Sequence, residues 1–331
     1  KTYLTIEVTG KNVGTPAGNI TLSNVSNPPI SASLTIKNGG SFLINSNSIV
    51  GAGSGSKTVK IESGGIFRTG DEDGFSGSNV TSIQPSVNID LQQGSTVEYS
   101  RMGDQVITSQ SFGAAPDNYN YQNLSISGSG TKSPSSTTTD LIVNGMTTMP
   151  VTNTATPTLL MPSNTNFYAL GGINNSNGAT GKFILSNDAN LLQHTDSRND
   201  AVNTNAVVTV EKSITPRVII SPVDAQKMKE IYGGDASNAG YIMELREPQG
   251  MFYNAYSGNY VKGKAYAVQE PKAGFVNGAT TVKAEFSGKP ANDNETDSDS
   301  NGGFTYNLAY STINAAVEHG FNLVGNPYPS N

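Results

Sequence analysis

Two similar stretches decide the fold: SLTIKNGGSFLI at residues 33–44 and TVKIESGGIFRT at residues 58–69. In both, apolar residues alternate with polar ones, two glycines follow, and a second alternating run begins. Alternation with a period of two places the apolar side chains on one face of a β-strand. Glycine relieves a bend that most other residues could not adopt without strain. Each stretch therefore predicts a strand, a corner and a second strand.

The pattern recurs less regularly further along the chain. VNIDLQQGSTVEY at residues 87–99 is a third unit and NLSISGSGT at 123–131 is a degraded fourth, so the glycines step by 25, 30 and about 34 residues. Residues 139–149 and 182–192 are interpreted as two further turns. A repeat of this length cannot bury its apolar face alone, but stacked repeats share a continuous core. We therefore predict an all-β protein that begins with an irregular right-handed parallel β-solenoid (β-helix) over residues 1–200.

The composition changes near residue 200. Residues 1–200 and the shorter stretch 201–331 each hold 23 charged side chains, and nine of the 14 tyrosines lie in the second stretch. Alternating runs there predict five strands, at 206–214, 241–247, 251–256, 265–269 and 281–286. Ser221-Pro222 and Ser311 are expected to start two short helices. The interpretation is a β-sandwich-like domain over 201–331 that continues past its last residue.

Composition excludes several classes of protein. Gly, Asn, Ser and Thr supply 141 of the 331 residues, and cysteine is absent. Disulfide scaffolds, Cys-ligated metals and Cys nucleophiles are thereby excluded. A net charge of −6 argues against nucleic acid as a partner. No apolar run approaches the roughly 18 residues of a transmembrane helix. Disorder is the alternative interpretation of so polar a chain, but the ordered alternation of apolar and polar residues favours strands.

The string FNLVGNPYPS at residues 321–330 resembles a motif of large secreted surface proteins of Bacteroidota. Similar proteins carry counterparts of four other segments, at 94–99, 121–132, 193–213 and 263–269. The resemblance implies export by a type IX secretion system (T9SS), with the outer-membrane secretion machinery as a partner. It also implies an extracellular, cell-surface location. Several such proteins are considered adhesins, including some associated with gliding motility.

An acidic segment near the end of the chain is the best single candidate for a metal site. Its calcium-ligating candidates are Asp293, Asp297, Asp299 and Asn301. Alternating carboxylates followed by Gly302 match the first six positions of a calcium loop. The twelfth position would be Leu308 instead of glutamate, so the segment is no EF-hand. The alternative is a solvated hairpin loop. No other cofactor is predicted.

A second acidic segment, DEDG at residues 71–74, suggests carbohydrate chemistry. Glycoside hydrolysis needs two placed carboxyl groups. The residues that could supply such a cluster are Asp71, Asp73, Asp90, Glu98, Arg101 and Asp104. A solvated loop is the alternative, and no residue is assigned as catalytic.

Tyrosines of the second region could bind sugars. Tyr253, Tyr256 and Tyr260 could stack on a glycan, because a tyrosine ring combines an apolar face with a polar tip. The alternative is that these rings form core and cross-strand pairs.

The function favoured by the sequence is a non-catalytic, secreted structural or adhesion protein of the cell surface, either a stalk or an adhesin segment. The repeat, the neutral polar exterior and the lack of a complete catalytic constellation support it. The alternatives are a carbohydrate-active β-helix, such as a polysaccharide lyase or glycosidase, and a glycan-binding module.

Overall fold

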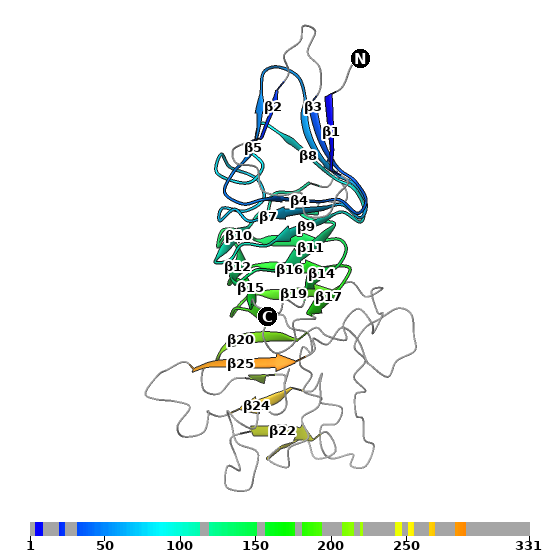
Figure 1. Ribbon diagram of the computed structural model, residues 1–331. Helices are drawn as coiled ribbons and strands as arrows, with labels where there is room; N and C mark the ends of the chain where they lie inside the picture. Colours follow the sequence, from blue (N-terminus) through cyan, green and yellow to red (C-terminus); the bar gives the residue numbers. More distant parts are fainter. Residues whose placement is uncertain are drawn as a thin grey trace.

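The structure is a computed structural model, and it describes a defined part of the chain. The described residues are 4–8, 20–23, 32–112, 119–150, 156–175, 181–193, 207–214, 219–220, 242–246, 251–254, 265–268 and 282–288. Their strands form a parallel β-solenoid of about six turns over residues 21–210, stacked as a column (Figure 1). The predicted solenoid is thus confirmed. Within this part of the chain no helix is long and apolar enough to cross a membrane.

One parallel sheet, sheet I, joins six successive coils. Its strands are β4 (Ser41–Ile44), β7 (Ile66–Thr69), β9 (Thr96–Tyr99), β11 (Asn123–Ile126), β14 (Thr147–Met149) and β17 (Ile173–Asn175). Successive strands start 24 to 30 residues apart, which is the length of one coil. Because the neighbours pair in parallel, the chain returns to the same side after every coil.

With the exception of β11, the described strand before each sheet I strand belongs to one of two sheets. Sheet III lies in the first coils and contains β1 (Leu4–Val8), β3 (Ala32–Ile36), β6 (Lys57–Ile61) and β8 (Asn88–Leu91). Sheet IV lies in the later coils and contains β13 (Asp140–Val143), β16 (Asn166–Ala169) and β19 (Asn190–Gln193). One position in the coil is therefore filled by two separate sheets.

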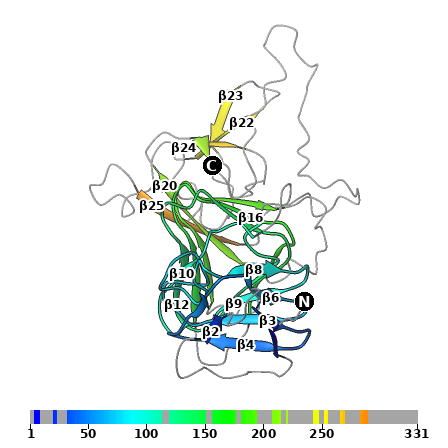
Figure 2. The ribbon, with the colours of Figure 1, turned by 90° about the horizontal axis from the view of Figure 1, so that it is seen from above.

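With the exception of β7, which is followed by β8 of sheet III, the strand after each sheet I strand belongs to sheet V or sheet II. Sheet V pairs β2 (Ile20–Ser23) with β5 (Ile49–Ala52). Sheet II contains β10 (Gln105–Ile107), β12 (Gly130–Pro134), β15 (Pro157–Met161), β18 (Lys182–Leu185), β20 (Val208–Ile214) and β25 (Val282–Gly288). Seen from above, the strands of successive coils lie over one another (Figure 2).

The core follows from the period of two. In β6 the residues alternate between buried and half-buried, so Val59 and Ile61 point inward and Lys60 points outward. The inward side chains form one continuous cluster from Leu22 to Val210. Full burial of each large apolar side chain contributes roughly 1.5–3 kcal/mol, and stacking extends that gain from coil to coil.

Glycines turn the corners, as predicted. Gly64 has φ 75°, a left-handed conformation that an L side chain rarely adopts. Its N–H donates to the Gly94 carbonyl at 3.0 Å, and its own carbonyl accepts from the Gly39 N–H at 3.1 Å. The three corners thus form a hydrogen-bonded column that joins the first coils.

The predicted register of the fourth repeat unit is wrong. The repeat pattern aligns residues 123–126 with strands that precede a glycine corner, such as residues 33–36. In the structure they pair with Thr96–Tyr99, a strand that follows the corner. The physical reason is a missing strand: among the described residues, none lies between β10 and β11.

Residues 108–112 and 119–122 lie in the place of that strand. The Phe112 N–H donates to the Tyr119 carbonyl at 2.9 Å, and the Tyr119 hydroxyl donates to the carbonyl of Leu91 in β8 at 3.1 Å. On the other side, Asn120 Oδ1 accepts the N–H of Ile142 in β13 at 2.6 Å. This segment therefore joins sheet III to sheet IV.

The parallel ladder continues past residue 200. In β20, Thr209 pairs in parallel with Ile184, and Val208 and Val210 are buried in the solenoid core. The described strands that follow pair antiparallel. They are β21 (Ile219–Ile220), β22 (Ile242–Arg246), β23 (Met251–Asn254) and β24 (Tyr266–Val268), which form a separate sheet, and β25, which pairs with β20.

Four of these strands overlap the strands predicted after residue 240. The two predicted helices, at Ser221 and Ser311, lie outside the described residues. The division at residue 200 remains a prediction.

Candidate functional site

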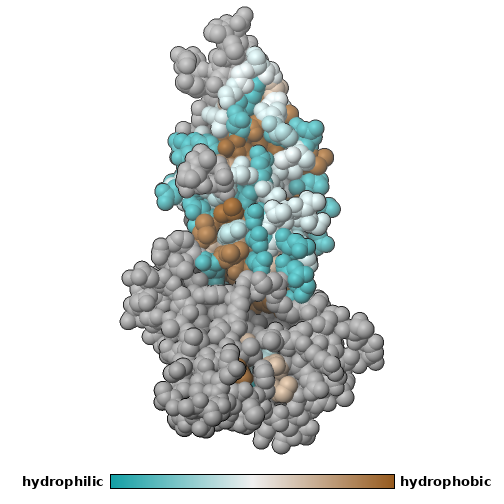
Figure 3. Space-filling model, turned by 180° about the vertical axis from the view of Figure 1, so that it is seen from behind, coloured by the Kyte–Doolittle hydropathy of each residue, from teal (hydrophilic) through white to brown (hydrophobic). Residues whose placement is uncertain are grey.

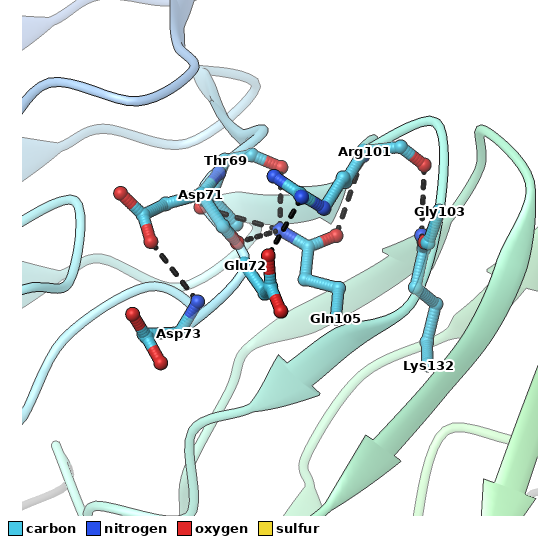
Figure 4. A network of polar contacts seen from close by, with 8 residues as sticks. All are labelled: Thr69, Asp71, Glu72, Asp73, Arg101, Gly103, Gln105 and Lys132. Atoms are coloured by element: carbon cyan, nitrogen blue, oxygen red, sulfur yellow. Dashed lines mark hydrogen bonds and ion pairs between the residues drawn. The ribbon is translucent and has the colours of Figure 1, made fainter.

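The most elaborate polar cluster lies at the corners that follow β7 and β9. Gln105 holds the two corners together (Figure 4). Its Nε2 donates to the Thr69 carbonyl at 2.9 Å and to the Asp71 carbonyl at 2.7 Å, and its Oε1 accepts the Arg101 N–H at 3.3 Å. Because one buried amide satisfies backbone groups of two coils, the residues of the predicted acidic cluster become neighbours here.

The charges of this cluster are arranged in pairs. Arg101 Nη2 contacts Glu72 Oε2 at 2.7 Å on the surface. The Asp71 side chain is buried, and its Oδ1 accepts the Asp73 N–H at 3.0 Å. Burial raises the pKa of Asp71, although the Asp73 N–H and Arg101 oppose the shift. The cluster thus combines a carboxyl group that holds its proton more tightly than usual with a neighbouring guanidinium.

Lys132 lies on the far side of Arg101, next to Gly103 (Figure 4). Its side chain is fully buried, and Nζ donates to three carbonyls: Arg101 at 2.8 Å, Gly103 at 2.5 Å and Ser129 at 2.7 Å. Burial lowers the pKa of Lys132 to about 8, and the Asp104 charge opposes the shift. Since all three N–H bonds are engaged, the ammonium group clamps two stacked corners together.

The other predicted carboxylates lie apart, each with its own partner. Glu98 Oε2 pairs with Arg68 Nε at 3.2 Å, and Glu98 Oε1 accepts from Ser127 at 2.5 Å. Asp90 accepts from Gln92 at 2.5 Å. Asp104 accepts the Thr131 N–H at 2.7 Å. The predicted set is therefore divided: only Asp71, Asp73 and Arg101 come together, with Glu72 beside them.

This arrangement can do limited chemistry. A glycosidase needs two carboxyl groups that face the scissile bond from opposite sides. Here Asp71 is bonded within its own loop and Glu72 is neutralised by Arg101. Within the part of the chain that the structure describes, no group of three or more His, Asp or Glu residues is placed to hold a metal ion.

Sequence reasoning missed a buried hydroxyl network beside this cluster. Tyr99 and Tyr121 share a hydrogen bond at 2.6 Å, and Tyr121 also donates to the Thr108 carbonyl at 2.6 Å. Burial raises the pKa of both tyrosines, that of Tyr121 most. It also missed Gln105 and Lys132. The signal for Lys132 was its position in an alternating strand, where the period of two makes it point inward with Pro134.

The remaining candidate residues lie largely beyond the described structure. The calcium candidates Asp293, Asp297, Asp299 and Asn301 lie outside the described residues, as do Tyr256 and Tyr260. The backbone of Tyr253 lies in β23, opposite Glu244 in β22. The calcium and glycan assignments therefore stay predictions.

Fold and polar cluster together define a parallel β-solenoid protein whose stacked corners are held by buried polar side chains. The chain belongs to a family described as a domain of unknown function (DUF8693), whose model matches residues 111–331. No curated protein and no solved structure matches the chain. The family match starts within residues 108–122, the segment at which sheet III gives way to sheet IV. The family unit thus contains the later coils together with the C-terminal region.

Proposed function

We propose that this protein is a non-catalytic structural and adhesion segment of a secreted cell-surface protein, in which the solenoid is a stiff stalk. The observation that carries the proposal is sheet I, whose six parallel strands join every coil from residue 41 to residue 175. Neighbouring coils share a backbone ladder and a continuous core, so a bend between any two would break both.

The outer surface supports the same proposal. Several of its charged groups form ion pairs, as Lys60 does with Glu62 and Arg68 with Glu98. One face of the described column shows hydrophilic and neutral residues with small apolar groups between them (Figure 3). A self-paired polar surface stays soluble while it presents little charge to a ligand. Such a surface suits a spacer better than an active-site wall.

The proposal has a finer architectural part. We infer right-handed coils, because parallel strands joined by crossovers are right-handed in about 98% of cases. The antiparallel strands β21 to β24 favour a sandwich-like module after residue 201, carried by the stalk. In this arrangement the module, not the stalk, contacts glycans or other extracellular surfaces. Export by the type IX machinery rests on the resemblance of residues 321–330 and its companion segments.

Surface location can be tested on cells that produce the protein naturally. An antibody against the solenoid is applied to intact cells and to lysed cells. We expect labelling of intact cells, and its loss when the outer-membrane secretion channel is inactivated. Labelling only after lysis would contradict a cell-surface role. In parallel, beads coated with the folded chain should adhere to extracellular glycans or surfaces more than beads coated with the heat-unfolded chain.

One observation favours a carbohydrate-active enzyme as second candidate: the buried Asp71, with its raised pKa, lies next to Arg101 on an outer corner. The full chain is incubated with a panel of acidic polysaccharides, and new reducing ends are measured. We expect no turnover. Turnover that disappears in Asp71→Ala but persists in Asp90→Ala, a carboxylate outside the cluster, would replace the stalk proposal with the enzyme.

A further inference from the structure

The strand β20 takes part both in the parallel solenoid and in an antiparallel pair with β25. Its first part continues the solenoid, because Thr209 and Val210 pair in parallel with Ile184 and Leu185 of β18. Val208 and Val210 are 2% and 3% exposed and belong to the solenoid core. On its other side, all seven residues of β20 pair with β25, which lies near the end of the described chain.

The direction of β25 decides whether the solenoid can add a further coil. Every sheet II strand from β10 to β20 runs parallel to its neighbour, whereas β25 runs antiparallel, with Val208 opposite Gly288 and Ile214 opposite Val282. A further solenoid coil would have to add a parallel strand at this edge. Because β25 already satisfies the outward backbone groups of β20 in the opposite direction, the stack cannot grow there.

Without β25 the same edge would attract other strands. It would present seven residues, VTVEKSI, with unpaired N–H and C=O groups over a length at which strands readily associate. Three of the seven are valine or isoleucine, and a fourth, Thr209, is also β-branched. Only two register pairs join β20 to β18, so β25 is its longer partner.

We propose that β25 is a C-terminal cap, and that its displacement turns the edge of β20 into a docking strand for a second copy of this chain. The occupant that fits is an antiparallel β-strand, and the freed β20 edge of the second copy supplies one when the two copies pair about a two-fold axis. Sixty-seven residues separate Ile214 of β20 from Val282 of β25 along the chain, and so long a connection allows β25 to leave its place on β20. The cap thus controls whether the protein stays monomeric.

The first experiment removes the cap in the full chain. Successive residues of a strand donate to opposite sides, so proline at both Ala284 and Glu285 must remove a donor to β20. The matched control carries threonine at both positions, which keeps the donors and favours a strand. Mass is measured by light scattering against concentration, and hydrogen exchange of β15 and β18 shows whether the solenoid stays folded.

We expect the Ala284→Pro/Glu285→Pro chain to associate, with at least a twofold rise in mass, while the threonine chain stays monomeric. A peptide spanning residues 280–290 should reverse the association, because it re-forms the antiparallel strand; a scrambled peptide should not. A monomeric proline chain with protected β15 and β18 would overturn the proposal. Association that the peptide leaves unchanged would overturn it as well.

A second variant decides the matter if the proline chain fails to fold. Thr209 and Ser287 lie directly opposite each other. Directly opposed antiparallel residues are about 4.5 or 5.5 Å apart between Cα atoms, and both separations suit a disulfide. Because the chain has no cysteine of its own, Thr209→Cys/Ser287→Cys locks only the cap. On mild heating the oxidised chain should stay monomeric and the reduced chain should associate; equal association of both would refute the cap.

Discussion

The N-terminal coils (residues 32–107) and the C-terminal coils (residues 123–193) share sheet I but turn their corners with different residues. Two positions before β6, Gly55 has φ 95°. At the same offset before β16 and β19 stand Asn164 with φ 63° and Asp188 with φ 66°. Asn and Asp are the side chains that most readily enter the left-handed region. The corner before β6 therefore uses glycine where the corners before β16 and β19 use Asn and Asp.

A second column of corner residues runs through both halves. Two positions before each sheet I strand stand Gly39, Gly64, Gly94, Tyr121, Gly145 and Gly171. Tyr121 is the exception, and it marks the coil in which residues 108–112 and 119–122 lie in the place of a strand. In this column glycine is required at Gly39 by a left-handed φ and at Gly171 by close approach, because a Cβ there would meet the backbone of Gly145.

The largest expected effect distinguishes the cost of a left-handed φ from the cost of close approach between coils. Gly128 and Gly39 have nearly equal φ, 71° and 75°. A Cβ on Gly128 would meet the Arg101 carbonyl oxygen, whereas a Cβ on Gly39 has nothing within 4 Å. Gly39→Ala should therefore cost only the left-handed strain, about 1–2 kcal/mol. Gly128→Ala adds a backbone overlap and should cost about 3 kcal/mol or more. Urea unfolding of both variants measures the two costs, and equal costs would show that close stacking does not matter.

The difference between the halves also explains what could be predicted from sequence. The solenoid was predicted because Gly39, Gly64 and Gly94 repeat visibly between alternating strands. The corner before β16 carries no comparable signal, because Asn164 takes the left-handed position there and asparagine is common throughout this chain. Nothing in the local sequence predicts that no described strand lies between β10 and β11. This feature depends on how Tyr119 and Asn120 bond to other coils.

The polar cluster was predictable only in part. The run of acidic residues at 71–73 is plain in the sequence, but its neighbours depend on which residue of the next coil lies opposite. That register brings Arg101 to Glu72 and sends Glu98 to Arg68. Sequence spacing cannot supply this information when coils vary in length by several residues.

Both halves contain a buried lysine that clamps corners. Lys57, 5% exposed, donates to the carbonyls of Gly53 and Gly55 in its own corner. Lys132, fully buried, donates to three carbonyls from two coils. The clamp in the N-terminal coils is thus local, and the one in the C-terminal coils joins two coils.

This difference predicts a second, intermediate effect. Lys132→Met removes three N–H···O bonds and should cost about 2 kcal/mol, against about 1 kcal/mol for Lys57→Met, which removes two. The pH dependence has a definite sign. The pKa of Lys132 is about 8 in the folded protein, against 10.5 for an ordinary lysine. Between these values the unfolded chain binds more protons, so the free energy of unfolding rises with pH.

The measurement is urea unfolding of the native chain and of Lys132→Met at pH values from about 7 to about 10. Methionine does not titrate, so the variant serves as the baseline at each pH. We expect the gap between the two proteins to widen above pH 8. A gap that narrows would mean that the three carbonyls outweigh desolvation and hold the pKa of Lys132 at or above its ordinary value.

The smallest expected effect tests whether glycine and asparagine are equivalent at the left-handed position of a corner. Asn164→Gly installs at β16 the residue that β6 uses, and stability should stay within about 0.5 kcal/mol, because glycine accepts the left-handed φ at the cost of a more flexible unfolded chain. Asn164→Ala keeps the β-carbon without the polar group that eases this conformation, and should cost about 1 kcal/mol. Urea unfolding of the three proteins ranks them. If the alanine chain equals the native one, the corner would not depend on the left-handed preference of asparagine. The two halves would then differ in composition alone, and the backbone ladder between Asn164 and Asp188 would be sufficient to hold the turn.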